Sequence, residues 1–176
     1  DRFEKFLAEI KDRCYATEVL MAMKHPDNYR DLIYWDYKKC RSKPKEKSNS
    51  FVPLIRQMAI DKGLAIPSIG READDLLSMW AYQAKAAKTP YIIASIDKDL
   101  TCIPGNHYNI KTKFKKKVTE VEALQFFYQQ LLSGDPVDSI PGLPGIGPVK
   151  AEALVKNLFT EEEMQEIVVT MYMSHY

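Results

Sequence analysis

Residues 134–150, GDPVDSIPGLPGIGPVK, constrain the fold more than any other part of the sequence. Four of the chain's 7 glycines and four of its 10 prolines fall within this stretch. Glycine permits positive φ and close backbone approach, whereas proline fixes φ and removes a hydrogen-bond donor. The stretch therefore predicts a shaped turn, placed directly behind two aspartates.

The second half of this turn resembles a known binding element. The run LPGIGPVKAEALV, residues 143–155, has the pattern of a helix-hairpin-helix, in which backbone N–H groups meet a phosphate at the start of the next helix. Contacts of that kind follow the nucleic-acid backbone and ignore base identity. A plain surface loop remains the alternative, because glycine and proline clusters form those too.

The bulk properties describe a soluble globular protein with one sizeable core. The chain has 176 residues, of which 45% are hydrophobic and 28% charged. Its 3 cysteines are scattered without C-x-x-C spacing, which favours reduced thiols over disulfides or a zinc site. No apolar run has the length of a membrane span, and no signal peptide is visible. Because the chain opens at Asp1 without methionine, we expect it to be a fragment.

The net charge of +1 conceals a segregation of charge along the chain. Basic residues gather in two runs and acidic residues in three clusters. The basic runs are Lys38, Lys39, Arg41, Lys43, Lys45 and Lys47, then Lys111, Lys113, Lys115, Lys116 and Lys117; the acidic clusters are Glu72/Asp74/Asp75, Asp97/Asp99 and Asp135/Asp138. Basic runs could neutralise phosphates and acidic clusters could hold hard cations, although a single basic run is commonly just a solvated loop.

Helices and strands alternate along most of the chain, which predicts an α/β fold with a helical appendage at the C-terminal end. Helices are expected at residues 3–15, 51–62, 71–88, 119–132, 148–157 and 161–174, and strands at 17–23, 64–67, 91–96 and 107–110. Capping boxes, Thr119 with Glu122 and Thr160 with Glu163, mark the start of two helices. The continuous apolar run 91–96 is suited to a central parallel strand.

Five carboxylates are expected at one edge of this sheet. Asp97 and Asp99 directly follow the apolar strand, and Glu72, Asp74 and Asp75 open a helix that follows a short strand. Such a cluster needs compensation, and Mg²⁺ or Mn²⁺ is the usual one. Two such ions about 4 Å apart can activate a water and stabilise the leaving oxygen of a phosphodiester. The alternative is that first-turn acids only complement the helix dipole and that Asp97-Lys98-Asp99 is an ordinary turn.

Three segments together resemble the 5′→3′ exonuclease and flap endonuclease family, closest to its phage-type members. They are YRDLIYWDYKKCR, EADDLLSMWAYQAKAAKTPYIIASIDKDL and GDPVDSIPGLPGIGPVKA, which span residues 29–155 in the family's order. The resemblance implies a PIN-like (resolvase-like) fold: a mostly parallel central sheet flanked by helices, with a C-terminal helix-hairpin-helix. It implies a catalytic domain over residues 1–133, with a basic arch or clamp at 28–50, and a DNA-binding region over 134–176.

The resemblance also implies two divalent-ion sites. Glu72, Asp74 and Asp75 would serve the first, Asp97 would lie between the two, and Asp99, Asp135 and Asp138 would serve the second. The family's earliest metal-binding aspartate, on its first strand, has no counterpart in this sequence. Where a second strand often ends in aspartate, this chain offers Met23, Lys24 or His25, with Asp27 nearby.

DNA contacts are implied in two places. In the arch, Lys38 and Arg41 would stabilise transition-state charge and Tyr37 could stack on a base, although packing of Tyr37 within the loop is the alternative. In the hairpin, backbone carbonyls from Leu143 to Ile146 would bind K⁺. The residues expected to meet DNA are Arg30, Tyr37, Lys38, Arg41, Gly142, Gly145, Ile146, Gly147 and Lys150. The sequence departs from the family at Ser139, which is usually asparagine, and at Val149, where lysine is common.

The expected activity is therefore a Mg²⁺- or Mn²⁺-dependent, structure-specific 5′→3′ DNA exonuclease or 5′-flap endonuclease that leaves 5′-phosphate and 3′-hydroxyl ends. We expect a monomer in the cytoplasm of a bacterium or phage-infected cell, acting in DNA replication or repair, with a polymerase fused or associated. Two alternatives stay open: a non-catalytic DNA-binding module, and a PIN-type ribonuclease. The hairpin argues against the ribonuclease, because A-form RNA presents different grooves.

Overall fold

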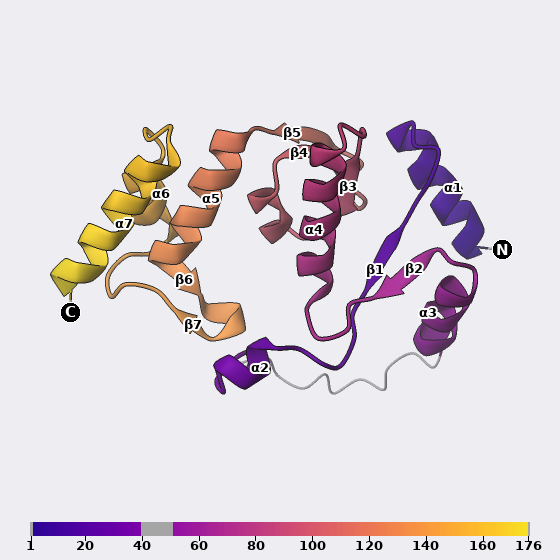
Figure 1. Ribbon diagram of the computed structural model, residues 1–176, viewed down its shortest axis with the longest axis horizontal. Coiled ribbons are helices and arrows are strands. Elements are labelled where there is room, and N and C mark those ends of the chain that lie inside the picture. Colours follow the sequence, from indigo (N-terminus) through magenta and orange to yellow (C-terminus); the bar gives the residue numbers. More distant parts are fainter. Residues whose placement is uncertain (1, 40–50, 176) are drawn as a thin grey trace. The chain divides into compact units, whose positions relative to one another are not determined.

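The computed structural model describes residues 2–39 and 51–175 (Figure 1). These residues form two compact units. The first unit comprises the described residues of 2–33, 51–97 and 106–116, and the second those of 34–39, 98–105 and 117–175.

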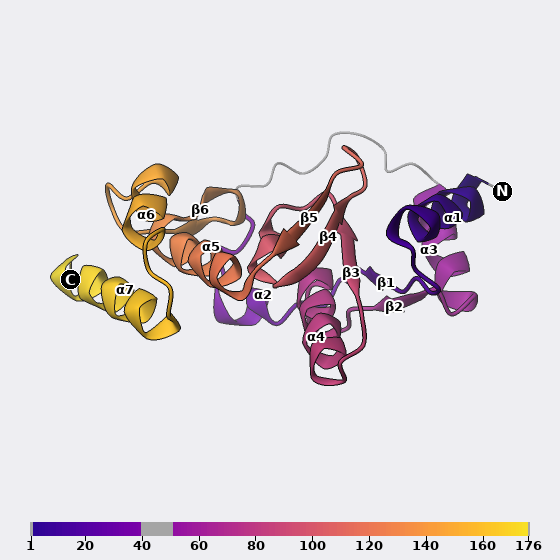
Figure 2. The ribbon, with the colours of Figure 1, turned by 90° about the horizontal axis from the view of Figure 1, so that it is seen from above.

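Short parallel strands and helices build the first unit (Figure 2). Its elements are α1 (Arg2–Cys14), β1 (Met21–Met23), α2 (Arg30–Ile33), α3 (Phe51–Asp61), β2 (Ala65–Pro67), α4 (Ala73–Ala86) and β3 (Ile92–Ser95), with most of β4 (Gly105–Asn109) and half of β5 (Lys115–Val118). β1 pairs in parallel with β2, Met21 opposite Ala65, and β3 pairs in parallel with β4, Ile92 opposite Asn106. The core includes Leu7 and Ile10 of α1, as the apolar face of that helix predicts.

The sheet differs from the expected one. Within the described residues, the strands of the first unit do not form one continuous sheet: β1-β2 is a separate pair, and β3-β4-β5 is a sheet in that order. The apolar run 91–96 was expected as a central strand, but β3 lies at an edge, because no described strand pairs with its other side. The strand expected at 17–23 is also shorter, since only Met21–Met23 pair.

β5 is a strand that sequence reasoning did not predict. Its Lys115, Lys116 and Lys117 are exposed, and Val118 is buried. Lysine is disfavoured in strands, so propensity does not indicate this element. Lysines are, however, typical of edge strands, because their charge discourages pairing with another sheet.

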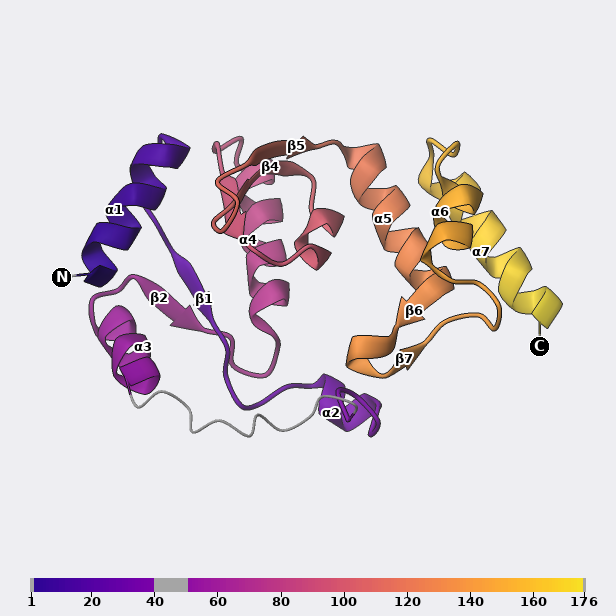
Figure 3. The same cartoon turned by 180° about the vertical axis from the view of Figure 1, so that it is seen from behind.

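The second unit is mainly helical (Figure 3). Its elements are η1 (3₁₀ helix, Asp99–Cys102), α5 (Glu120–Ser133), β6 (Gly134–Asp135), η2 (3₁₀ helix, Pro136–Asp138), β7 (Ile140–Pro141), α6 (Pro148–Val155) and α7 (Glu161–His175). The core consists of Tyr128, Leu132, Leu143, Ala151, Val155, Met164 and Val168. This core packs α5 against α6 and α7, so α5 belongs to the same unit as residues 134–175. The sequence had predicted a domain boundary between residues 133 and 134.

Both predicted capping boxes are confirmed. At α5, Thr119 N donates to Glu122 Oε2 at 2.7 Å, and Glu122 N donates to Thr119 Oγ1 at 3.2 Å. At α7, Thr160 N donates to Glu163 Oε2 at 3.1 Å, and Glu163 N donates to Thr160 Oγ1 at 3.3 Å. Each box satisfies backbone groups that the start of a helix would otherwise leave unpaired. No helix in the described ranges 2–39 and 51–175 has the length and apolar character needed to cross a membrane.

Candidate active site

The start of α4 holds three of the expected metal-binding carboxylates. Glu72 is the N-cap residue, and its backbone N donates to Asp75 Oδ2 at 3.0 Å as half of a capping box. Asp74 lies in the first turn and is exposed. The favourable effect of acids at a helix N-terminus, which the sequence left as an alternative, thus operates here, because Glu72 and Asp75 cap the helix.

Arg30 of α2 forms a bidentate ion pair with Asp75. Its Nη1 lies 2.5 Å from Asp75 Oδ2 and its Nη2 lies 2.7 Å from Oδ1, with both side chains about a quarter exposed. The hydrogen bond to Arg30 holds the pKa of Asp75 below its ordinary value. Asn28 Nδ2 contacts Glu72 Oε1 at 3.4 Å. Arg30 was expected to meet DNA, and in the first unit its guanidinium binds a carboxylate that was expected to hold metal.

The segment after β1 offers one carboxylate. Asp27 Oδ2 lies 3.4 Å from His25 Nδ1, and Asp27 N donates to the same nitrogen at 3.2 Å. His25 N in turn lies 3.4 Å from Ser68 Oγ, which belongs to the turn before α4. Asp27 is therefore tied to His25, and Met23 and Lys24 add no carboxylate to the position where the family often has one.

The Asp97-Lys98-Asp99 run divides between the units. Asp97 belongs to the first, is exposed, and has its backbone N–H bonded to Ser95 Oγ at 3.0 Å. Asp99 begins η1 in the second, where Gln130 Nε2 of α5 donates to its Oδ1 at 3.0 Å. Asp97 and Asp99 are therefore held by different neighbours, Ser95 of the first unit and Gln130 of the second.

In the second unit, Tyr37 and Lys38 of the expected arch segment contact Asp138. Tyr37 OH donates to Asp138 Oδ2 at 3.2 Å, and Lys38 Nζ lies 3.6 Å from the same oxygen. Lys38 N also donates to Asp138 O at 2.9 Å. Tyr37 is only 8% exposed, which agrees with the packing role kept open for it. Asp135 Oδ1 accepts from Val137 N and Asp138 N at 2.9 and 3.3 Å, so this carboxylate shapes η2.

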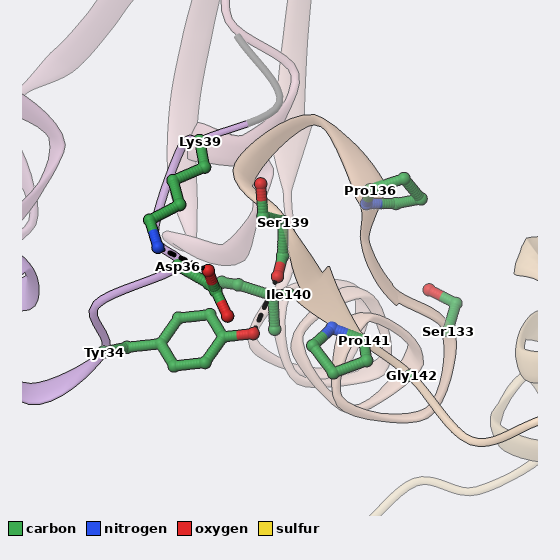
Figure 4. A pocket seen from close by; sticks show the side chains of 9 residues that line it. All are labelled: Tyr34, Asp36, Lys39, Ser133, Pro136, Ser139, Ile140, Pro141 and Gly142. Carbon is green, nitrogen blue, oxygen red and sulfur yellow. Dashed lines mark hydrogen bonds and ion pairs between the residues drawn. The ribbon is translucent and has the colours of Figure 1, made fainter.

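A pocket of about 420 Å³ lies between the arch segment and the hairpin (Figure 4). Tyr34 donates to Ser139 O at 3.0 Å across it, and Lys39 bonds to Asp36 at 2.7 Å. Ser139 has φ 62°, a left-handed conformation in which asparagine is enriched, which accounts for the asparagine usual at this position. Tyr34 was not among the expected site residues, and no local pattern marks its contact across 105 positions.

The hairpin glycines play two different roles. An added Cβ would collide with backbone atoms of residues 140–142 at Gly134, and with those of Ser133 and Gly134 at Gly142, so these two glycines permit the close approach of the end of α5 and β6 to β7. At Gly145, φ is +77° with open space around it, and Gly147 caps α6 in open space too. Lys150 Nζ donates to Gly145 O at 3.0 Å, which stabilises the exposed tip.

The residues proposed for K⁺ lie at this tip, but Leu143 is buried in the core and its carbonyl accepts from Ile146 N at 3.0 Å. Arg41 lies outside the described residues. Across residues 2–39 and 51–175, no group of three or more His, Cys, Asp or Glu side chains lies close enough to hold a metal ion. The seven expected carboxylates divide between the units, Glu72, Asp74, Asp75 and Asp97 in the first and Asp99, Asp135 and Asp138 in the second.

The fold and these motifs place the chain among the resolvase-like 5′ nucleases. The family described as "5′-3′ exonuclease, N-terminal resolvase-like domain" matches residues 2–129, and the chain belongs to this family. The match ends before the hairpin.

The relatives are bacterial nucleases and a polymerase. The chain is 31% identical to "Flap endonuclease Xni" of Shewanella loihica over 142 residues, 76% of this chain and 56% of that protein. It is also 31% identical to "DNA polymerase I" of Rhizobium leguminosarum over 140 residues, 73% of this chain and 14% of that protein. The chain thus spans about half the length, or less, of these relatives.

Solved structures share the fold. The T5 5′-exonuclease with bound zinc superposes with a TM-score of 0.63 at 14% identity, covering 96% of this chain and 76% of the other. A bacteriophage T5 flap endonuclease in a pseudo-enzyme–product complex with DNA and metal ions gives 0.64 at 14% identity, covering 94% and 74%. At this identity the likeness extends to the fold alone.

Proposed function

We propose that the chain is the nuclease part of a divalent-metal-dependent, structure-specific 5′→3′ DNA exonuclease or 5′-flap endonuclease, which hydrolyses phosphodiesters to 5′-phosphate and 3′-hydroxyl ends. The observation that carries the proposal is the contact of Tyr37 and Lys38 with Asp138. It brings a cation suited to a phosphate next to a carboxylate suited to a metal, within a family of 5′ nucleases.

The donor set fits Mg²⁺ or Mn²⁺ by its chemistry. All seven proposed ligands are carboxylates, the hard oxygen donors that these ions prefer: Glu72, Asp74, Asp75, Asp97, Asp99, Asp135 and Asp138. When bound, the ions would lower the pKa of a water and stabilise the leaving oxygen. Gln130 would orient Asp99, to which it donates a hydrogen bond, and Arg30 would hold Asp75 ionised through its own hydrogen bond to that carboxylate.

Cations and backbone donors would bind the DNA. Lys38, together with Arg41, would stabilise charge on the scissile phosphate. The tip of the hairpin, Gly145 to Gly147, would meet duplex phosphates through backbone N–H groups at the start of α6, with K⁺ as a further ligand of the turn. The similarity to a flap endonuclease and to a DNA polymerase I supports DNA as substrate and a polymerase as a fused or associated partner. We propose the cytoplasm of a bacterium or phage-infected cell as the compartment and a monomer as the working form.

The test uses a labelled 5′-flap DNA with the chain, in Mg²⁺ and separately in Ca²⁺, following both cleavage and binding. Asp97→Asn should lower the cleavage rate by on the order of 100-fold with binding kept or strengthened, because it removes a metal ligand and a negative charge. Asp12→Asn, at another exposed aspartate, in α1, is the matched control and should cut normally. Normal cutting by Asp97→Asn would refute the metal assignment.

A non-catalytic DNA-binding module is the second candidate. Two observations favour it: in the described residues no three potential ligands lie within reach of one ion, and Asp75 is already engaged by Arg30. Binding of the flap DNA without cleavage in Mg²⁺ or Mn²⁺ would select this candidate. Cleavage in Mg²⁺ but not in Ca²⁺ would reject it.

A further inference from the structure

The pocket between residues 34–39 and the hairpin has the character of a small-ligand site, and no step of the proposed hydrolysis uses it. Its volume of about 420 Å³ lies within the range of ligand pockets, about 300–1,000 Å³. Tyr34, Asp36 and Lys39 form one side, and the hairpin with the end of α5 forms the other (Figure 4). All of the lining residues belong to the second unit.

The hairpin side of the pocket presents apolar surface to solvent. Ile140 is 42% exposed, and Pro136 and Pro141 are exposed as well. A ligand that covers these side chains removes apolar area from water, which favours binding. On the other side, the ring of Tyr34 is held by the hydrogen bond from its hydroxyl to Ser139 O at 3.0 Å. A flat, largely apolar ligand therefore fits between the two sides.

One carboxylate and one ammonium group give the pocket its polarity. Asp36 Oδ1 accepts a hydrogen bond from Lys39 Nζ at 2.7 Å, and the two side chains remain 39% and 47% exposed. Across residues 2–39 and 51–175, no hydrogen bond reaches the second oxygen, Oδ2 of Asp36. A matching ligand therefore supplies donors to the carboxylate and an acceptor to the ammonium group.

The residues beside the pocket favour a nucleotide as its ligand. Lys38 N donates to Asp138 O at 2.9 Å, and Ser139, the next residue, lines the pocket. Lys38 and Asp138 are the cation and the carboxylate proposed to act on the scissile phosphate, so a base of the bound strand can enter the pocket while its phosphates stay outside. Nucleobases are flat, stack on aromatic rings, and carry donors and acceptors side by side on their edges.

Guanine matches the polar pair better than the other bases do. Its Watson–Crick edge carries two adjacent donors, N1–H and N2–H, which one carboxylate can accept together, as it accepts the two donors of an arginine. The O6 acceptor next to them suits an ammonium group. Adenine and cytosine offer the carboxylate one amino group each, and thymine would turn a carbonyl oxygen toward it. Because base pairing covers the Watson–Crick edge, the base must be unpaired.

We propose that the pocket binds one unpaired base of the 5′ strand and prefers guanine to adenine, cytosine and thymine. Asp36 accepts from N1–H and N2–H, Lys39 donates to O6, and the ring lies between Tyr34 and the hairpin prolines. The choice of DNA as the ligand rests on the proposed function, whereas the base preference rests on the pocket. A good bidentate contact changes relative affinity by roughly 5- to 150-fold, and the exposure of this ion pair places the expected value at the lower end.

The first measurement titrates the chain with the four deoxynucleoside 5′-monophosphates in EDTA, followed by NMR of the backbone amides. All carry the same phosphate, so differences in affinity report the base. dGMP should bind roughly fivefold more tightly than the others and shift the amides of Lys39, Ser139 and Gly142. Deoxyinosine monophosphate, which lacks the N2 amino group, should lose most of this advantage. Asp36→Asn should abolish the preference, whereas Asp31→Asn, at an exposed aspartate of α2 outside the pocket, should keep it.

A second measurement detects a preference that mononucleotides bind too weakly to show. 5′-flap DNAs with an all-thymine flap receive one guanine at successive positions, and binding is measured by fluorescence anisotropy in Ca²⁺. Affinity should rise by roughly fivefold at one position and not at the others, and Asp36→Asn should remove the rise. Equal affinity at all positions, or an equal rise in Asp36→Asn, would overturn the proposal. Cleavage without base preference would refute the pocket and leave the nuclease standing, and guanine-selective binding without cleavage would do the reverse.

Discussion

The contribution of the Arg30–Asp75 ion pair to the stability of the first unit can be measured quantitatively. We consider Arg30→Ala, Asp75→Ala and the double variant, because a double-mutant cycle removes effects that belong to one residue alone. One such effect is the contact of the Arg30 guanidinium with the Tyr29 ring, 4.8 Å from its centroid. Capping of α4 by Asp75 is another.

The expected coupling follows from the geometry. Exposed ion pairs contribute roughly 0.2–1 kcal/mol, whereas hydrogen bonds to charged groups contribute about 1.5–3 kcal/mol. The pair is bidentate, at 2.5 and 2.7 Å, but its side chains remain 27% and 26% exposed, so solvent screens part of the attraction. We therefore expect a coupling free energy of about 1–2 kcal/mol at pH 7.

The stability that Asp75 contributes should also decrease as the pH falls. The pKa of Asp75 is lowered in the folded chain, chiefly by the hydrogen bond from Arg30. A carboxyl group with a depressed folded pKa contributes stability that is complete above its unfolded pKa, about 3.9, and is lost as pH falls through the folded value. The stability advantage of the parent over Asp75→Ala should accordingly shrink in acid and be constant from pH 6 to 8.

Urea unfolding, followed by circular dichroism at pH 7 and at pH 3, measures each corner of the cycle. Asp12→Ala replaces Asp75→Ala in a control cycle with Arg30→Ala, and its coupling should be zero within error. A coupling below about 0.3 kcal/mol in the main cycle at pH 7 would refute the reasoning, because that is the level at which distant sites add.

Three further predictions concern the second unit. Gly142→Ala should destabilise it by about 1–3 kcal/mol in urea unfolding, because the added methyl collides with backbone, and an unchanged midpoint would contradict the packing described. Tyr37→Phe should cost about 0.5–1.5 kcal/mol in the same assay, since it removes the hydrogen bond to Asp138; no loss would mean that this bond is absent in solution. Gly145→Ala should weaken duplex binding, measured by fluorescence anisotropy, at every sequence alike, whereas Gly63→Ala, with a similar positive φ and open surroundings, should not. Equal loss of binding in both variants would point to backbone strain alone.

Local patterns accounted for most helices of the fold. The caps at Thr119 and Thr160 and the apolar spacing of α1 are short-range signals, and the structure places those helices within a residue or two of the expected bounds. The sequence-based predictions were wrong for some strands, because the position of a strand in a sheet depends on the strands that pair with it. The run 91–96 is apolar enough for a central strand, yet which strands lie beside β3 is a property of pairing. β5 escaped notice because its lysines oppose strand propensity and only its pairing with β4 makes it a strand.

For the candidate site as well, the sequence predicted the residues marked by local motifs and missed the contacts between distant residues. Motifs pointed to Glu72, Asp75 and Asp138 as chemically important carboxylates, but they did not indicate their neighbours. Arg30 is 45 positions from Asp75, and Tyr37 is 101 positions from Asp138. No periodicity or local propensity connects residues at such separations, so their pairing emerges only from the folded chain.

The close backbone contact between Gly134 and Gly142 limits how the β6–β7 hairpin can evolve. At each position a side chain would strike main-chain atoms, not another side chain, so no second substitution elsewhere can make room for it. Gly134 in addition has φ 68° and ψ −174°, a conformation that is essentially restricted to glycine. Ordinary compensation, in which a smaller neighbour accommodates a larger one, is therefore closed to this pair. These two glycines can therefore be lost only if the hairpin itself is rebuilt.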